Sequence, residues 1–253
     1  MTATTDAKST RPRTSTLDRP TLIRLAATEY DRFASLLHGL QTEDWTRPTE
    51  CPGWDVRAMA GHCLGMTEMA TSIRDGMRQQ RLAGKRGGVM IDALTALQVD
   101  EQADLTTQQL IERFEKIGPK AARARRRTPR IIGNRRMPGE QTVGGSLEAW
   151  TLGYLMDTIL TRDPWMHRMD IAKATGTSPE LSADHDGVLV ADVVTEWSVR
   201  HGEACELTLI GPAGGRWSFG ADGPILELDA IDFCRTVSGR GPATGLLATQ
   251  VPF

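Results

Sequence analysis

Three side chains in two separate stretches of the sequence have the types needed to hold a divalent metal. His62 lies in one stretch, and Asp163 and His167 lie four residues apart in the other. Two imidazoles and one carboxylate can bind a divalent metal and leave a coordination position open for water or a substrate. The sequence therefore predicts a metal-dependent reaction centre built on these three residues.

The spacing of Asp163 and His167 suits a helix. Residues four apart on an α-helix differ by about 40° around its axis, so both side chains point the same way. Thr161 is expected to cap this helix and Pro164 to fall in its first turn. Asp163 would then lie near the positive end of the helix dipole, which favours its ionised form. Gly176 is expected to end the helix.

The third side chain, His62, belongs to another predicted helix. Residues 54–80 are predicted to form one long helix with Asp55 as its N-cap. Apolar residues recur along it at steps of three and four and predict a buried stripe: Val56, Met59, Cys63, Met66, Ala70, Ile73 and Met77. His62 lies beside this stripe, which would point it into a helix bundle. The alternative is a hydrogen-bonded core histidine, with Asp163 and His167 an ordinary surface pair.

The remaining periodicity predicts an α+β fold. Residues 20–40 and about 90–127 have the spacing of amphipathic helices, the second with a kink or stop at Gly118 and Pro119. Residues 146–160 have helical spacing and lead into the helix of His167. The expected elements beyond Pro179 are a helix over 184–199, strands at 205–210, 216–219 and 226–229, a short helix over 230–237 and a last strand over 246–251.

These elements divide the chain into three parts. Residues 20–178 are expected to form a helical bundle, and residues 179–253 a small α+β domain. Residues 1–19 are rich in Ser and Thr, contain several basic residues and lack an apolar stretch. They are predicted to be a disordered tail, because a secretory signal needs an apolar segment.

Two sequence motifs resemble a known family. The run Cys-Pro-Gly-Trp-Asp-Val-Arg at 51–57, with Gly-His at 61–62, and the run Asp-Pro-Trp-Met-His-Arg-Met-Asp-Ile-Ala at 163–172 resemble the two signatures of the mycothiol-dependent maleylpyruvate isomerase-like family of actinobacteria, part of the DinB-like metalloprotein superfamily. The last residues, 245–253, resemble the tail of its two-domain members. The resemblance implies an N-terminal DinB-like four-helix bundle followed by a small α+β C-terminal domain.

The resemblance also implies a site. It implies zinc, or another divalent metal, held by His62, Asp163 and His167, and mycothiol as a thiol cosubstrate. Arg240 resembles an arginine of the second domain that holds a substrate carboxylate, which would make it catalytic. The chain departs from the family at Asp163, where the characterised isomerase type carries a glutamate, and this departure puts identity with that one reaction in doubt. Asp170, three residues beyond His167, could orient the His167 imidazole from outside the ligand set.

Three functions follow from such a centre. The favoured one is a thiol transferase or a maleylpyruvate isomerase-like cis-trans isomerase, in which the thiol adds to a small, electrophilic and anionic substrate. The second is a zinc-dependent hydrolase, in which zinc-bound water replaces the thiol. The third is a non-catalytic DinB-like metal-binding protein. Dependence of turnover on a thiol would separate the first from the second.

Composition limits the partners. The net charge of −2 and the absence of a long apolar run argue against nucleic acid and membrane partners. Four scattered cysteines without a Cys-x-x-Cys pair indicate that the protein lies in a reducing cytoplasm. A monomer or a homodimer is expected. Seven arginines between residues 123 and 136 are expected to form a solvated helix end and loop. The alternatives are that these arginines bind the phosphates of a nucleic acid, or that they attract an anionic small molecule toward the metal. His185 and His201 are expected at the surface or in loops.

Overall fold

The structure is a computed structural model, and it describes residues 11–253. Its α-helices, in chain order, are α1 (Arg19–Gly39), α2 (Val56–Met69), α3 (Ile73–Arg86), α4 (Met90–Glu101), α5 (Thr107–Arg127), α6 (Arg130–Gly133), α7 (Leu160–Thr175), α8 (Val188–His201) and α9 (Ala230–Val237). Its strands are β1 (Gln141–Val143), β2 (Ser146–Glu148), β3 (Cys205–Ile210), β4 (Gly215–Phe219) and β5 (Ile225–Asp229). Two 3₁₀ helices, η1 (Thr42–Thr46) and η4 (Gly245–Ala248), and two π-helical segments, η2 (Tyr154–Ile159) and η3 (Ala183–Gly187), complete the elements.

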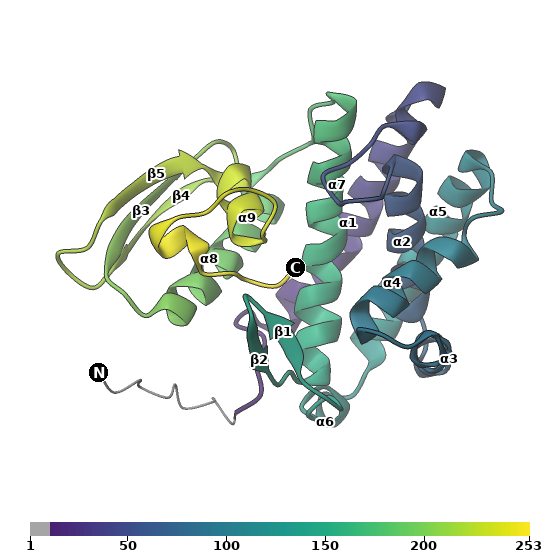
Figure 1. Ribbon diagram of the computed structural model, residues 1–253, viewed down its shortest axis with the longest axis horizontal. Coiled ribbons are helices and arrows are strands. Elements are labelled where there is room, and N and C mark those ends of the chain that lie inside the picture. Colours follow the sequence, from purple (N-terminus) through teal and green to yellow (C-terminus); the bar gives the residue numbers. More distant parts are fainter. Residues whose placement is uncertain (1–10) are drawn as a thin grey trace.

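Helices α1, α2, α5 and α7 form a four-helix bundle, as predicted. Helix α1 packs against α5 and α7, and α2 packs against the same two helices (Figure 1). Helices α3 and α4 form a hairpin that leans on the outer side of α2. Apolar side chains fill the bundle core, where the rings of Phe33 and Phe114 stack with their centroids 5.0 Å apart. Burial of this apolar surface is the main force that holds the helices together.

The helix that carries His62 is shorter than predicted. Asp55 caps it as expected, because its side chain accepts a hydrogen bond from the backbone N–H of Ala58 at 2.7 Å. It ends at Met69, and Ser72 then caps α3 by accepting from the N–H of Asp75. The apolar stripe continues across this break, which is why periodicity alone predicted one helix.

Two other predicted boundaries differ. Helix α5 continues through Gly118 and Pro119, and Gly118 lets it approach Tyr30 closely, because a Cβ there would lie 3.0 Å from that of Tyr30. Residues 146–160 are not one helix: residues 141–148 form the β1–β2 hairpin, and the helical run begins only after it. Cross-strand pairing overrides the helical spacing of the apolar residues in this stretch.

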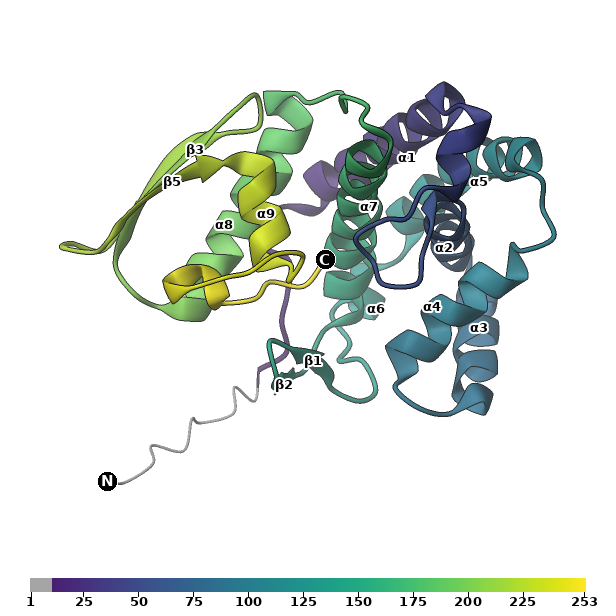
Figure 2. The same cartoon turned by 45° about the horizontal axis from the view of Figure 1, so that its top comes forward.

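The C-terminal part of the chain is a three-stranded sheet with helices on one face. The strand order is β4-β3-β5, with β3 antiparallel to β4 and parallel to β5. Helices α8 and α9 lie between the sheet and the bundle (Figure 2). Strand β3 alternates accordingly, with Cys205, Leu207 and Leu209 buried toward the helices. The predicted strand at 246–251 is instead the 3₁₀ helix η4 followed by an irregular tail.

Helix α7 belongs to both halves of the molecule. Leu160 and Ile171 lie in the bundle core, whereas Trp165, Met166 and Met169 lie in the core shared with α8, α9 and the sheet. Most residues of the helix are therefore buried, and it lies between the bundle and the second half (Figure 1). The domain boundary near residue 178 stays a prediction. Helix α7 contributes apolar side chains to the core of the second half as well as to that of the bundle.

The N-terminal segment differs in part from the predicted disordered tail of residues 1–19. Arg13 donates its backbone N–H to Ala149 and accepts from the N–H of Thr151, at 2.8 and 3.0 Å. Thr16 donates to the Asp192 carboxylate. These bonds hold residues 13–16 against the β2–α7 connection and α8. Residues 1–10 of that prediction lie outside the described residues.

Two residues expected at the surface are buried instead. His185 is 2 % exposed and its Nε2 lies 2.8 Å from Glu29, which also pairs with Arg168. Arg125, expected in a solvated helix end, is 0 % exposed and donates to Tyr30, to Thr161 and to backbone carbonyls. A buried charge requires such partners. No helix within residues 11–253 has the length and apolar character that a membrane span requires.

Candidate metal centre

The structure brings His62, Asp163 and His167 together between α2 and α7. One carboxylate oxygen of Asp163, Oδ2, lies 3.4 Å from Nε2 of His62. The other, Oδ1, lies 3.6 Å from Nε2 of His167. One ligand atom from each of the three residues falls within 4.8 Å of the others. The three donors therefore meet at one point. Asp163 and His167 do so because they are four residues apart on α7, and His62 because it faces the inside of the bundle on α2, as their spacing predicted.

This donor set fits a tetrahedral zinc. Ligands about 2.0–2.1 Å from a tetrahedral ion are roughly 3.3 Å from one another, close to the distances found here. Asp163 Oδ2 is buried and has no hydrogen-bond partner among residues 11–253. A buried carboxylate oxygen without a partner is costly unless something binds it. Zinc binding itself stays a prediction.

Asp163 is ionised for a different reason from the one predicted. Burial raises its pKa, but the electrostatic interactions with His167 and His62 outweigh burial and lower the pKa to about 2. The prediction invoked the start of a helix, with Thr161 as its cap. The helical run begins upstream, at residue 152, and Thr161 is a buried residue inside it that accepts from Arg125. The helix dipole therefore has little effect at Asp163.

Asp170 lies behind the His167 imidazole, where the sequence placed it as an orienting residue. Its Oδ2 is 3.0 Å from Nδ1 of His167, which leaves Nε2 facing Asp163 and His62. A carboxylate that accepts from one imidazole nitrogen fixes the ring and its tautomer. His62 differs, because its Nδ1 is buried without a hydrogen-bond partner among the described residues.

Arg240 also reaches this centre, through Asp170. Its Nε lies 2.9 Å from both oxygens of the Asp170 carboxylate, and its side chain is 14 % exposed. Arg235 of α9 pairs with the same carboxylate at 3.2 Å. Asp170 therefore joins the candidate metal centre to the second half of the chain. The predicted role of Arg240 in holding a substrate carboxylate stays a prediction.

The sequence analysis missed several groups around the centre. Glu50 forms ion pairs with Arg235 and with Lys173, the latter at 2.6 Å. These contacts join residues more than a hundred positions apart, so no local spacing could reveal them. Only the position of Glu50, next to the motif at 51–57, was a signal.

Cys51 and Trp54 complete the surroundings. A ligand atom of Cys51 lies within 4.8 Å of those of His167 and Asp170. Burial raises the pKa of the Cys51 thiol to about 11, although the charge of Arg240 opposes this, so the thiol is protonated at neutral pH. The Trp54 ring covers the centre, with its centroid 5.0 Å from that of His62 and 6.0 Å from that of His167.

Replacing the orienting carboxylate should weaken metal binding without abolishing it. We expect Asp170→Asn to lower the affinity for zinc by about 10–100-fold, because His167 loses its ionic partner and Arg235 and Arg240 lose the carboxylate that they share. Competition with a chromophoric chelator measures the change. The matched control is Asp184→Asn, at an exposed carboxylate of the second half. Equal zinc affinities of Asp170→Asn and the wild type would contradict the role assigned to Asp170.

Comparisons with known proteins support the family and the fold. Residues 26–172 match the family described as the mycothiol maleylpyruvate isomerase N-terminal domain. The crystal structure of the mycothiol-dependent maleylpyruvate isomerase is similar, with a TM-score of 0.56, 16 % identity, and coverage of 89 % of this chain and 90 % of that one. A histidine-to-alanine mutant of that isomerase gives a TM-score of 0.53 at 17 % identity with the same coverage. At this identity the likeness shows the fold. No curated protein matches the chain.

Proposed function

Because the chain belongs to the family of the mycothiol maleylpyruvate isomerase N-terminal domain, we propose that it is a zinc-dependent enzyme that uses the thiol mycothiol. Its substrate is a small, anionic electrophile, which it isomerises about a double bond or conjugates to the thiol. The observation that carries the proposal is the convergence of two imidazoles and one ionised carboxylate at His62, His167 and Asp163.

The three donors leave a coordination position for an exogenous group. Zinc bound there would favour the deprotonated form of a coordinating thiol, which is the nucleophile that either reaction needs. Asp170 keeps Nε2 of His167 turned to the centre by accepting from Nδ1. Trp54 packs against both imidazoles and limits the access of water to them.

The charges beside the centre support an anionic substrate. Arg235, Arg240 and Lys173 bring three positive charges, which face the two carboxylates of Asp170 and Glu50. The ionised Asp163 balances the third charge before a metal binds, so a bound divalent ion would leave the site positive. Glu50 is an exposed residue on a loop, so a substrate carboxylate could exchange with it at Arg235.

Turnover with and without thiol tests the proposal. Zinc-loaded protein is mixed with maleylpyruvate, or with other small electrophilic acids, in the presence and absence of mycothiol. We expect consumption of the electrophile to require mycothiol and to be lost in His167→Ala. The control is His38→Ala, at an exposed histidine that pairs with Glu115 at the end of α1.

The same assay distinguishes the alternatives. Consumption without any thiol would contradict the proposal and favour a hydrolase in which water is the nucleophile. Stoichiometric zinc with no consumption in the presence of any thiol would favour a non-catalytic metal-binding protein.

A further inference from the structure

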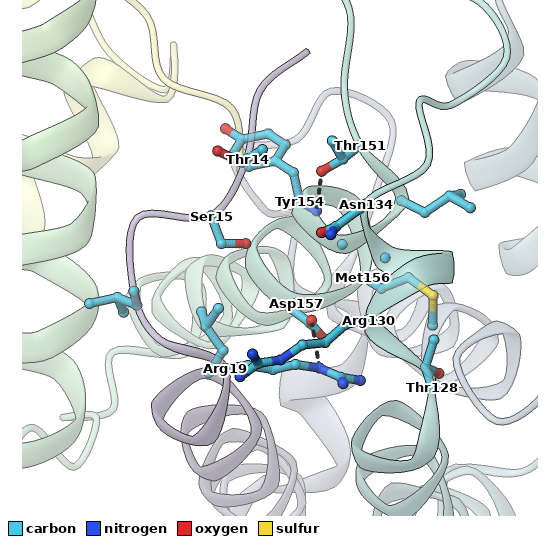
Figure 3. Close-up of a pocket in the computed structure, with 15 residues that line it drawn as sticks. Thr14, Ser15, Arg19, Thr128, Arg130, Asn134, Thr151, Tyr154, Met156 and Asp157 are labelled. Atoms are coloured by element: carbon cyan, nitrogen blue, oxygen red, sulfur yellow. Dashed lines mark hydrogen bonds and ion pairs between the residues drawn. The ribbon is translucent and has the colours of Figure 1, made fainter. Parts of the chain in front are cut away.

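A cavity far from the metal centre lies at the opposite end of α7. It measures about 320 Å³, opens to solvent, and is lined by side chains from residues 14–19, from residues 128–134 around α6, and from the π-helical segment η2 (Figure 3). Asp157, in its wall, lies ten residues before His167, which corresponds to roughly 15 Å along a helix. Its volume is within the range of small-molecule sites, about 300–1,000 Å³. The cavity is therefore large enough for a ligand and separate from the metal.

The wall of this cavity carries hydrogen-bond donors that no group within residues 11–253 uses. The side chains of Arg130, Asn134 and Thr14 make no hydrogen bond or ion pair with any of residues 11–253. Figure 3 shows Arg130, Asn134 and Thr14 around the hollow, with Arg19 beside Arg130. A guanidinium, an amide and a hydroxyl directed at one space suit an oxyanion with neighbouring hydroxyl groups.

The charge balance of the cavity is positive. Its one carboxylate, Asp157, lies 3.4 Å from Nε of Arg19 and 3.9 Å from Nε of Arg125, so it is already paired. Arg130 remains without a counter-ion within the described residues. Four further arginines between residues 123 and 136 also lack an ion pair with residues 11–253, namely Arg123, Arg126, Arg127 and Arg135. Clustered cations around a concave site raise the local concentration of anions.

The wall is held in place by backbone contacts. The backbone of Gly153 lies directly against that of Gly133, since a Cβ on Gly153 would be 3.1 Å from the Gly133 carbonyl oxygen. The N–H of Leu152 donates to the carbonyl of Arg135 at 2.8 Å. These contacts fix the segment of Arg130 and Asn134 on the helical run. The π-helical turn that follows is the kind of widened turn that often occurs at functional sites.

We propose that this cavity binds a small, hydroxyl-rich anion with one phosphate or carboxylate group. Arg130 pairs with the anionic group, and Asn134 and Thr14 bind neighbouring hydroxyls. The apolar side chains of Leu17, Leu22 and Met156 in the same wall contact the carbon skeleton. The site is independent of the metal centre and of the reaction proposed for it.

Isothermal titration of the full chain tests this site with three probes that share one skeleton: glucose 6-phosphate, gluconate and neutral glucose. We expect at least one of the two anions to bind and glucose to bind at least tenfold more weakly. Arg130→Ala should weaken the binding of the anion by about tenfold or more, as the loss of a charge-assisted hydrogen bond predicts. Asn134→Ala should weaken it by a smaller factor. The relative affinities of the two anions identify the preferred group.

Two controls make the result specific. Arg126→Ala removes an equally exposed arginine of the same segment that does not line the cavity, and it should leave the affinity unchanged. His62→Ala should also leave it unchanged, which separates this site from the metal centre. Three results would overturn the proposal: no binding of either anion, equal binding of glucose, or equal losses in Arg126→Ala and Arg130→Ala. The last of these, together with binding of a single-stranded oligonucleotide, would point to a diffuse nucleic-acid surface instead.

Discussion

His62→Ala and His167→Ala should each lose most of the zinc that the wild-type protein holds, while both variants remain folded. Each substitution removes one of three donors, and two remaining donors bind zinc far more weakly. We expect a loss of affinity greater than the roughly 10–100-fold expected for Asp170→Asn, because that residue acts only through His167. Elemental analysis of purified protein measures the metal content, and circular dichroism measures the fold.

The control for this experiment is His38→Ala, which should retain the metal. His38 is an exposed histidine in the last turn of α1, and it pairs with Glu115 rather than with the centre. Stoichiometric zinc in both His62→Ala and His167→Ala would show that these residues are not ligands.

The donor triad could be predicted from the sequence because helical geometry relates the directions of side chains that are close in the chain. The four-residue spacing of Asp163 and His167, and the phase of His62 beside an apolar stripe, are local properties that a helix converts into direction. The N-cap at Asp55 and the left-handed end of α7 at Gly176 could be predicted for the same reason. The three strands of the C-terminal sheet also lie within a residue of their predicted bounds.

The residues that surround the triad could not be predicted in this way. Asp170 contacts Arg235 and Arg240 across 65 and 70 positions of the chain, and Glu50 contacts Lys173 across 123. Such pairs leave no periodic pattern. Charged side chains are also normally assigned to the surface, so the burial of Arg125 and His185 contradicts the rule that sequence analysis applies.

The second motif is dense in charged and aromatic residues because α7 is covered on every side. Asp163 and His167 face the metal centre, while Trp165 lies in the C-terminal core. Arg168 pairs with Glu29 of α1, and Arg162 pairs with carboxylates of α8. Each turn of this helix therefore meets the bundle, the second half and the site at once. A motif of this kind constrains the fold as much as the chemistry.

The buried ion pairs of Arg162 should contribute strongly to the stability of the fold. Arg162 is 1 % exposed and lies 2.7 Å from both Asp192 and Glu196 of α8. We expect Arg162→Ala to lower the free energy of unfolding by about 3–5 kcal/mol, because it leaves two buried carboxylates without this partner. Urea denaturation with a chelator present measures the change without a contribution from metal. Arg126→Ala, at an exposed position, is the control and should change the stability by less than about 0.5 kcal/mol.

The pH dependence of the stability gives an independent test of the same contact. Burial raises the pKa of Glu196, but the charges of Arg162 and Arg200 outweigh burial and lower the pKa from 4.5 to about 2. A carboxylate whose pKa is lowered by folding stabilises the protein above its unfolded pKa, and this contribution is lost as the pH falls toward its folded pKa. The difference between 4.5 and 2 corresponds to about 3 kcal/mol, lost between roughly pH 5 and pH 2. Glu196→Gln and Arg162→Ala should both flatten the profile in this window. Their double variant should cost less than the sum of the two single changes, since each already breaks the shared contact. A profile that stays as steep in both variants would place the acid-sensitive carboxylates elsewhere in the chain.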